Sequence, residues 1–205
     1  MQIQKDEIRN RILAVASREF INNGVKRTSI KTIANKANVA VGNVYNYYKG
    51  KDDLLRAVLA PLFTAFKDYH NKSISEEYVS IDIFHNQVYY DMMYQQVSSL
   101  IIPFRKELYM LIFETAGTSL ENDFDRLLET AYSDGIAYLA NIKNLSSHIN
   151  KNISPHFVRI MCGLWASVIR YIVTHEGLTE VEINGIITDY VNFGMGGWRK
   201  LIGIE

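Results

Sequence analysis

Residues 28–51, TSIKTIANKANVAVGNVYNYYKGK, constrain the fold more than any other part of the chain. Ile30, Ile33 and Ala37 recur at intervals of three and four, which is the spacing of an amphipathic helix. The dipeptide Asn38-Val39 interrupts this spacing, and a helical pattern resumes after it. We therefore predict two short helices joined by a tight turn.

The same segment contains no aspartate or glutamate, whereas lysines lie within it. A helix without carboxylates can approach phosphate groups without repulsion, as a helix-turn-helix must do to enter a major groove. Two helices of an ordinary bundle are the alternative interpretation, but a bundle surface would more often interleave glutamate with lysine. The pattern indicates a helix-turn-helix that contacts duplex DNA.

The segment also resembles, in order and without gaps, the DNA-binding segment of the TetR family of bacterial transcriptional repressors. The residues that carry the resemblance are Thr28-Ser29, Ile33-Ala34, Asn38-Val39, Gly42-Asn43-Val44-Tyr45, Tyr47-Tyr48, Lys51, Asp52-Asp53 and Leu54-Leu55. The resemblance covers the first quarter of the chain. It implies an all-α fold with two domains: an N-terminal three-helix helix-turn-helix DNA-binding domain, residues 1–50, and a C-terminal helical ligand-binding and dimerisation bundle, residues 51–205.

One position departs from the family pattern. Ala40 stands where the family usually has a serine or threonine that caps the recognition helix. Alanine offers no side-chain acceptor to the first turn, a loss typically of about 1 kcal/mol. We expect the start of this helix to depend on packing or on DNA contact.

The resemblance also implies which side chains touch DNA. The exposed face of the recognition helix is expected to consist of Val41, Gly42, Asn43, Tyr45, Asn46 and Tyr47. Asn43 and Asn46 are suited to adenine edges, and Val41 to a thymine methyl group. The expected phosphate contacts are Tyr45, Lys51, Thr28 and Ser29, with Lys31 reaching a phosphate or a guanine. Tyr48, in the place of the family's buried aromatic residue, is expected in the core.

Charge is distributed unevenly, although the formal net charge of the chain is zero. Residues 1–56 carry 11 Lys and Arg against 5 Asp and Glu, whereas residues 57–205 carry 11 against 17. A basic head on an acidic body is expected of a DNA-reading module joined to a second domain. Charge scatter on a solvated surface is the other explanation.

Composition and motifs disfavour several classes of protein. The single cysteine, Cys162, excludes an intrachain disulfide and fits a reducing cytoplasm. The histidines show no metal-ligand spacing, and no phosphate loop or nucleophile–base signature is present, so we expect no enzyme activity, cofactor or metal. The uncharged stretch between Arg159 and Arg170 is ten residues long, which is too short to span a bilayer, so we expect no membrane partner. A helical-bundle enzyme and a helical protein-interaction module remain the alternatives.

Helical spacing continues through the rest of the chain, with stop and start signals between the helices. Asn22-Asn23-Gly24 is predicted to end the first helix, and Asp52-Asp53 to open the fourth, which continues to about Tyr69. Capping boxes are predicted at Ser73/Glu76, Thr118/Glu121 and Thr179/Glu182, and a helix start at Ser154-Pro155. The later helices are predicted at residues 81–101, before Gly117, from the Thr118 box to 145, at 154–176 and at 179–201.

A ligand pocket is expected mainly because the family places a cavity among its middle helices. Aromatic rings with polar tips would suit such a cavity, although rings of this kind are often plain core. The expected ligand-binding residues are Tyr89, Tyr90, Met93, Tyr109, Phe113, Tyr132 and Trp165. The resemblance further implies a homodimer joined by the last two helices, which binds a near-palindromic operator in double-stranded DNA and is released by a small apolar or amphipathic effector.

Overall fold

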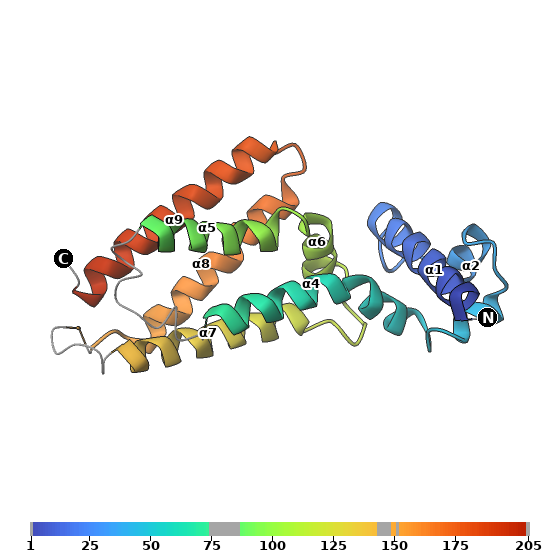
Figure 1. Cartoon of the computed structure of the whole chain (residues 1–205), viewed down its shortest axis with the longest axis horizontal. Coiled ribbons are helices and arrows are strands. Elements are labelled where there is room, and N and C mark those ends of the chain that lie inside the picture. The colour runs from blue at the N-terminus through green and yellow to red at the C-terminus, as the bar shows by residue number, and fades with distance from the viewer. Residues whose placement is uncertain (1, 74–86, 143–148, 151, 204–205) are drawn as a thin grey trace. The chain divides into compact units, whose positions relative to one another are not determined.

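The computed structural model describes residues 2–73, 87–142, 149–150 and 152–203, and within them all regular structure is α-helical. The predicted all-α fold class is therefore confirmed. The helices, in chain order, are α1 (Gln2–Asn23), α2 (Ile30–Lys36), α3 (Val41–Tyr45), α4 (Lys51–Ser73), α5 (Gln87–Ile101), α6 (Arg105–Phe113), α7 (Asp123–Ile142), α8 (Pro155–Thr174) and α9 (Glu180–Ile202) (Figure 1).

These helices form two compact units. The first contains Met1–Phe63 and Lys106–Phe124, and the second contains Thr64–Arg105 and Asp125–Glu205. The helix-turn-helix segment therefore packs in one unit with α6 and the turns that follow α6. The functional boundary between residues 50 and 51 stays a prediction.

The core of the first unit forms where α1, α2 and α3 bury their apolar faces. Ile12 and Phe20 of α1 and Ile33 of α2 are fully buried. The first helix ends at Asn23, and Gly24 follows with a φ of 80°, a left-handed conformation that favours glycine at a helix C-terminus. The predicted stop signal is confirmed.

Helix α4 begins where the sequence predicts, with Asp52 and Asp53 in its first turn. It continues four residues beyond Tyr69, to Ser73, and passes through Pro61 without ending. Pro61 is exposed, so the loss of its N–H donor falls on the solvent side of the helix.

The segment after α6 differs from its prediction. Thr118 does not open a helix: its Oγ1 accepts a hydrogen bond from the Leu120 N–H at 3.1 Å and donates to the Thr115 carbonyl at 2.7 Å. These bonds stabilise consecutive turns, and α7 begins only at Asp123. The predicted capping box at Thr118 and Glu121 is wrong as a helix start because both side chains bond to turn backbone instead.

The last two helix starts agree with the sequence. Helix α8 begins at Pro155 after Ser154, although the Ser154 side chain makes no capping bond. At α9 the Thr179 side chain accepts from the Glu182 N–H while Glu182 accepts from the Thr179 N–H, which is a complete capping box. Ser73 of the predicted Ser73/Glu76 box is the last residue of α4, and its hydroxyl donates to the His70 carbonyl at 2.8 Å. Glu76 and the start of the helix predicted from residue 81 lie outside the described residues.

The second unit packs α5, α7, α8 and α9 around a shared core. Helices α5 and α9 are joined by hydrogen bonds from the Tyr94 hydroxyl to Asn184 Oδ1 at 2.8 Å and from the Tyr90 hydroxyl to the Thr188 carbonyl at 3.3 Å. One buried cluster in this unit contains Leu139, Ile142, Ile149, Ile153, Val158 and Ile202.

Helix α8 is the one described helix long and apolar enough, by length and composition, to cross a membrane. One third of its most apolar 18-residue window is buried inside the protein. Core helices of proteins without membrane spans meet the same criterion. The exposed part of α8 carries large apolar side chains, namely Phe157, Ile160, Leu164 and Tyr171.

Candidate functional site

The turn between α2 and α3 is built from side-chain and backbone caps. Ser29 is the N-cap of α2, and its Oγ accepts a 3.0 Å hydrogen bond from the Thr32 N–H. Asn38, in the turn, has a φ of 52°, which asparagine tolerates better than most residues. Ala40 is the N-cap of α3 and makes no side-chain bond, as its sequence predicts.

Helix α3 buries one side and exposes the other. Val44 and Tyr48 are buried in the unit core, which confirms the prediction for Tyr48. Val41 is 37% exposed and Tyr45 is 54% exposed. Gly42, Asn43 and Asn46 are exposed as well, and Tyr47 is half-buried. We refer to Val41, Gly42, Asn43, Tyr45, Asn46 and Tyr47 as the α3 surface.

The two lysines of α2, Lys31 and Lys36, differ in their ion-pair partners. Lys31 is exposed on α2 and has no ion pair among the described residues. Lys36 donates to Glu19 Oε1 at 2.6 Å, and Glu19 is 7% exposed. Glu19 also accepts from the Asn23 side chain. Lys36 therefore compensates a buried carboxylate and joins α2 to α1, whereas Lys31 is free to meet another charge.

Two predicted phosphate contacts have other partners in the structure. Thr28 is 3% exposed, and its hydroxyl lies 2.8 Å from the Gly24 carbonyl and 3.2 Å from the Glu19 carbonyl, one of which accepts its proton. The hydroxyl thus faces inward, where it is not placed to contact a phosphate as the sequence predicts. Lys51 Nζ donates to the Val25 carbonyl at 3.0 Å and to the Thr28 carbonyl at 3.3 Å, so it braces the turn between α1 and α2.

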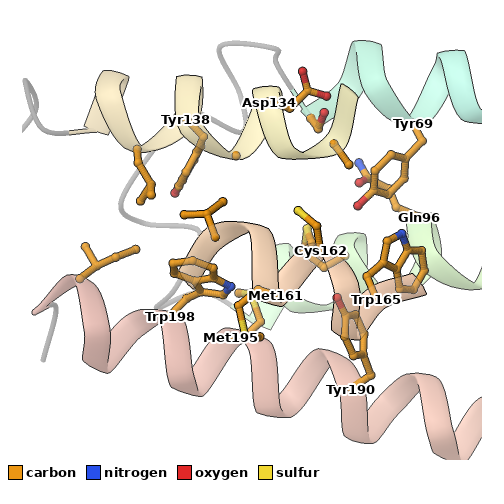
Figure 2. A pocket seen from close by; sticks show the side chains of 17 residues that line it. Tyr69, Gln96, Asp134, Tyr138, Met161, Cys162, Trp165, Tyr190, Met195 and Trp198 are labelled. Atoms are coloured by element: carbon orange, nitrogen blue, oxygen red, sulfur yellow. The ribbon is translucent and has the colours of Figure 1, made fainter. Parts of the chain in front are cut away.

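The second unit contains a cavity of about 260 Å³ between helices α4, α5, α7, α8 and α9 (Figure 2). It is lined by Tyr69, Ser73, Met93, Gln96, Ala131, Asp134, Gly135, Tyr138, Leu139, Val158, Met161, Cys162, Trp165, Tyr190, Met195, Trp198 and Ile202. The Trp165 and Tyr190 rings stack with centroids 5.3 Å apart. The wall is therefore mostly aromatic and apolar, with a few polar tips.

Burial sets the chemistry of the polar tips. It raises the pKa of Tyr138 and of Tyr190, so both phenols remain neutral at ordinary pH. Burial also raises the pKa of the Cys162 thiol, which keeps it protonated and weakly nucleophilic. Asp134 Oδ2 lies 2.6 Å from His70 Nδ1, a hydrogen bond that joins α7 to α4 within this unit. No group of three potential metal ligands occurs among the described residues.

Comparison with known proteins identifies the N-terminal segment. Residues 12–58 match the family described as bacterial regulatory proteins, tetR family. A relative from Haemophilus influenzae, named as an uncharacterized HTH-type transcriptional regulator, is 30% identical over 76 residues. The N-terminal segment is thus similar to the DNA-binding segment of TetR-family regulators. The matched residues span 37% of this chain and 41% of that relative, less than half of each.

Solved structures of bacterial regulators share the fold of nearly the whole chain. NalD, the secondary repressor of the MexAB-OprM multidrug efflux pump in Pseudomonas aeruginosa, superposes with a TM-score of 0.67 over 98% of both chains at 17% identity. FadR, a fatty acid degradation regulator from Bacillus halodurans, gives 0.65 at 14% identity over 92% of this chain and 98% of its own. A complex of SmeT with triclosan gives 0.65 at 17% identity over 92% and 91%. At these identities the likeness concerns the fold.

Two of the seven expected ligand-binding residues line the cavity, namely Met93 and Trp165. Tyr90 bonds to the Thr188 carbonyl, and Tyr132 lies under the guanidinium of Arg159, whose Cζ is 4.1 Å from the ring centroid. Tyr109 and Phe113 are exposed on α6 in the first unit. The side chain of Tyr89 lies outside the described residues. The described tyrosines of the expected set therefore face α9, Arg159 or solvent and not the cavity.

Most residues of the cavity wall cannot be recognised as such from the sequence. One sequence feature that can indicate a cavity is a polar residue at an apolar position of a helical stripe. Gln96 lies between Met93 and Leu100 on the apolar side of α5, and Asp134 lies at the same kind of position on α7. The contributions of Tyr190 and Trp198, by contrast, carry no such signal, because buried aromatic residues are ordinary core residues.

Proposed function

We propose that this protein is a ligand-responsive transcriptional repressor of the cytoplasm that binds a near-palindromic operator as a homodimer. The observation that carries the proposal is the α3 surface, an exposed helix face without a carboxylate, together with the exposed Lys31 of α2 in the same helix-turn-helix. Such a face can meet the phosphate backbone and base edges at once. Burial of Asn43 and Asn46 in the protein would have argued against this role, and both are exposed.

In this proposal the contacts are of two kinds. Asn43 and Asn46 hydrogen bond to adenine edges, and Val41 packs on a thymine methyl group, so these residues select the sequence. Ser29, Lys31 and Tyr45 contact phosphates and hold α3 in the groove. The exposure of all six side chains supports this assignment.

The homodimer is supported by a stripe of exposed apolar side chains on α8. Phe157, Ile160, Leu164 and Tyr171 follow one another at helical spacing, and Ile160 is 65% exposed. A contiguous apolar face on a soluble protein usually marks an interaction surface. We propose that α8 and α9 pair with their copies in a second protomer, which would present two α3 surfaces to major grooves about 34–36 Å apart.

We further propose that a small apolar or amphipathic effector occupies the cavity and lowers operator affinity. Helix α4 contributes residues 51–63 to the first unit and 64–73 to the second, and Tyr69 and Ser73 near its end line the cavity. An effector that binds one position of this helix more tightly would shift the population that can bind operator, by its difference in affinity for the two states. The complex of SmeT with triclosan supports a small molecule as ligand of this fold.

The proposal is tested by a gel shift with the DNA that flanks the protein's own gene. We expect retardation at nanomolar protein, a shift that persists with unrelated DNA in excess but is lost with unlabelled flanking DNA in excess, and protection of two half-sites. Asn43→Ala should bind more weakly by about 1–3 kcal/mol and relax the preference at one base step. Asn35→Ala, an exposed asparagine of α2 outside the α3 surface, is the matched control. Salt-insensitive binding to proteins, with no DNA shift, would instead favour a helical interaction module.

A further inference from the structure

One polar atom in the cavity wall has no hydrogen-bond partner in the part of the chain that the structure describes. Gln96, on α5, is 7% exposed, and its Nε2 atom has no acceptor among the described residues. Nearly all buried amide groups in proteins are hydrogen-bonded, because an unmet donor has lost its hydration without replacement. A ligand that places an oxygen at this point would supply the missing acceptor.

The packing of α5 gives no reason for an amide at this position. Val97 and Leu100 are 2% exposed, and Met93 lines the cavity on the same side of the helix. A methionine in place of Gln96 would continue this apolar stripe without leaving a donor unmet. The amide is therefore better explained as a group that orients a ligand than as part of the core.

The charges around the cavity disfavour an anionic ligand. The 17 described residues that line it include Asp134 and neither lysine nor arginine (Figure 2). A bound carboxylate would lose its hydration without meeting a cationic side chain of the wall, and the Asp134 carboxylate would repel it.

A cationic ligand is not required either. The Asp134 carboxylate already has a partner, since its Oδ2 atom is 2.6 Å from His70 Nδ1. The phenols of Tyr138 and Tyr190 and the indoles of the two tryptophans are neutral, and most of the wall is apolar. Apart from the paired Asp134, the described part of the wall is uncharged, and it holds the unmet donor Gln96 Nε2.

We propose that the effector is an uncharged molecule with an apolar body and an oxygen acceptor, such as a ketone or an ester, that accepts a hydrogen bond from Gln96 Nε2. This inference rests on the proposed function, because it names the ligand class of the same cavity. It excludes fatty-acid carboxylates and quaternary ammonium cations as effectors.

The experiment compares three probes with similar alkyl chains and different head groups: 2-decanone, decanoate and decyltrimethylammonium. Affinities are measured by calorimetry on the full chain and by tryptophan fluorescence, which reports directly because both tryptophans of the chain, Trp165 and Trp198, line the cavity. We expect 2-decanone to bind at least tenfold more tightly than either charged probe. Equal or tighter binding of decanoate or of the ammonium probe would overturn the inference.

Variants then test the role of Gln96. Gln96→Met should weaken 2-decanone binding about three- to tenfold, which is the range of one hydrogen bond. The same change should leave the melting temperature of the unliganded protein unchanged or raised, because it removes an unmet donor. A residue with a purely structural role would lose stability instead. Gln95→Met, at an exposed position of the same helix, is the matched control and should alter neither quantity. Unchanged ketone affinity in Gln96→Met would contradict the proposal.

Operator binding measured on the same samples separates this inference from the proposed function. Protein that shifts operator DNA but binds none of the three probes would overturn the ligand class and leave the DNA-binding proposal standing. Protein that binds 2-decanone through Gln96 but shifts no operator would overturn the DNA-binding proposal and leave the ligand class standing.

Discussion

The carboxylate of Glu114 accepts a 2.7 Å hydrogen bond from the backbone N–H of Val25, a residue 89 positions earlier in the chain. Val25 is buried directly after Gly24, where the chain leaves α1 in a left-handed conformation. A Cβ atom at Gly24 would lie 3.2 Å from Glu114 Oε2, so the two segments approach closely. The bond fastens the residues after α6 to the turn that leads into the helix-turn-helix.

Loss of this bond should destabilise the first unit. Glu114→Ala leaves the Val25 N–H without its acceptor in a largely buried position, which should cost about 1–3 kcal/mol of unfolding free energy. Urea unfolding followed by circular dichroism measures the change. Lys106→Ala, at an exposed position of α6, is the control and should stay within about 0.5 kcal/mol of the wild type. Equal midpoints for Glu114→Ala and the wild type would show that the bond contributes nothing.

Lys31 and Lys51 should affect DNA binding in different ways. Lys51→Ala removes two hydrogen bonds to the carbonyls of Val25 and Thr28, so we expect a lower unfolding free energy of the first unit. We also expect this variant to bind all DNA sequences more weakly to the same extent. Lys31→Ala should leave stability unchanged and reduce the slope of log affinity against log salt by about 1, because one phosphate contact is lost. Thermal unfolding and a salt titration of the gel shift separate the two. Identical behaviour of the two variants would contradict this distinction.

The sequence predicted those features that depend on neighbouring residues. The stop at Gly24, the aspartates that open α4 and the capping box of Thr179 and Glu182 all agree with the structure, because each depends on residues within one turn. The exposure of the α3 surface could also be predicted, since Val44 and Tyr48 fix which side of the short helix is buried.

Features that depend on distant residues were not predicted. Thr28 has the hydroxyl expected of a phosphate contact, but its partners are carbonyls of α1 and the turn after it. Local spacing also misleads at Thr118 and Glu121, which have capping-box spacing but bond to turn backbone within four residues. The cavity wall draws on five helices, and no single helix reveals which of its rings faces a space.

Restoring a cap to α3 should stabilise the helix-turn-helix. Ala40 has φ −65° and ψ 146°, which is N-cap geometry, but no side-chain acceptor. Ala40→Ser should therefore add about 1 kcal/mol to the unfolding free energy of the first unit, and Ala40→Gly should not reach that gain. Urea midpoints measure both. If serine gave no gain, the first turn of α3 would already be satisfied by other groups.

The capping box of α9 should give stability a dependence on acid pH. Hydrogen bonds from the N–H and the hydroxyl of Thr179 lower the pKa of Glu182 in the folded protein. A carboxyl group with a lowered pKa stabilises the fold above its unfolded pKa and loses this contribution as pH falls through the folded value. The wild type should thus be more stable than Glu182→Gln at neutral pH, and the difference should disappear at acid pH. Thermal unfolding of both proteins from pH 7 to pH 3 tests this, and a constant difference would contradict it.

A charge on the apolar stripe of α8 should prevent dimer formation and, through it, operator binding. Ile160 is 65% exposed, so Ile160→Glu should change the stability of the single protomer by no more than about 0.5 kcal/mol. In a dimer the same carboxylate would be buried against its copy without a cation, a cost that a homodimer interface does not tolerate. Sedimentation velocity should therefore show a folded monomer, and the gel shift should fail because a single α3 surface meets only one half-site. Ala140→Glu, which adds the same charge at an exposed position of α7, should remain dimeric and bind operator. A monomeric Ile160→Glu that bound operator with full affinity would show that the two half-sites are not read together.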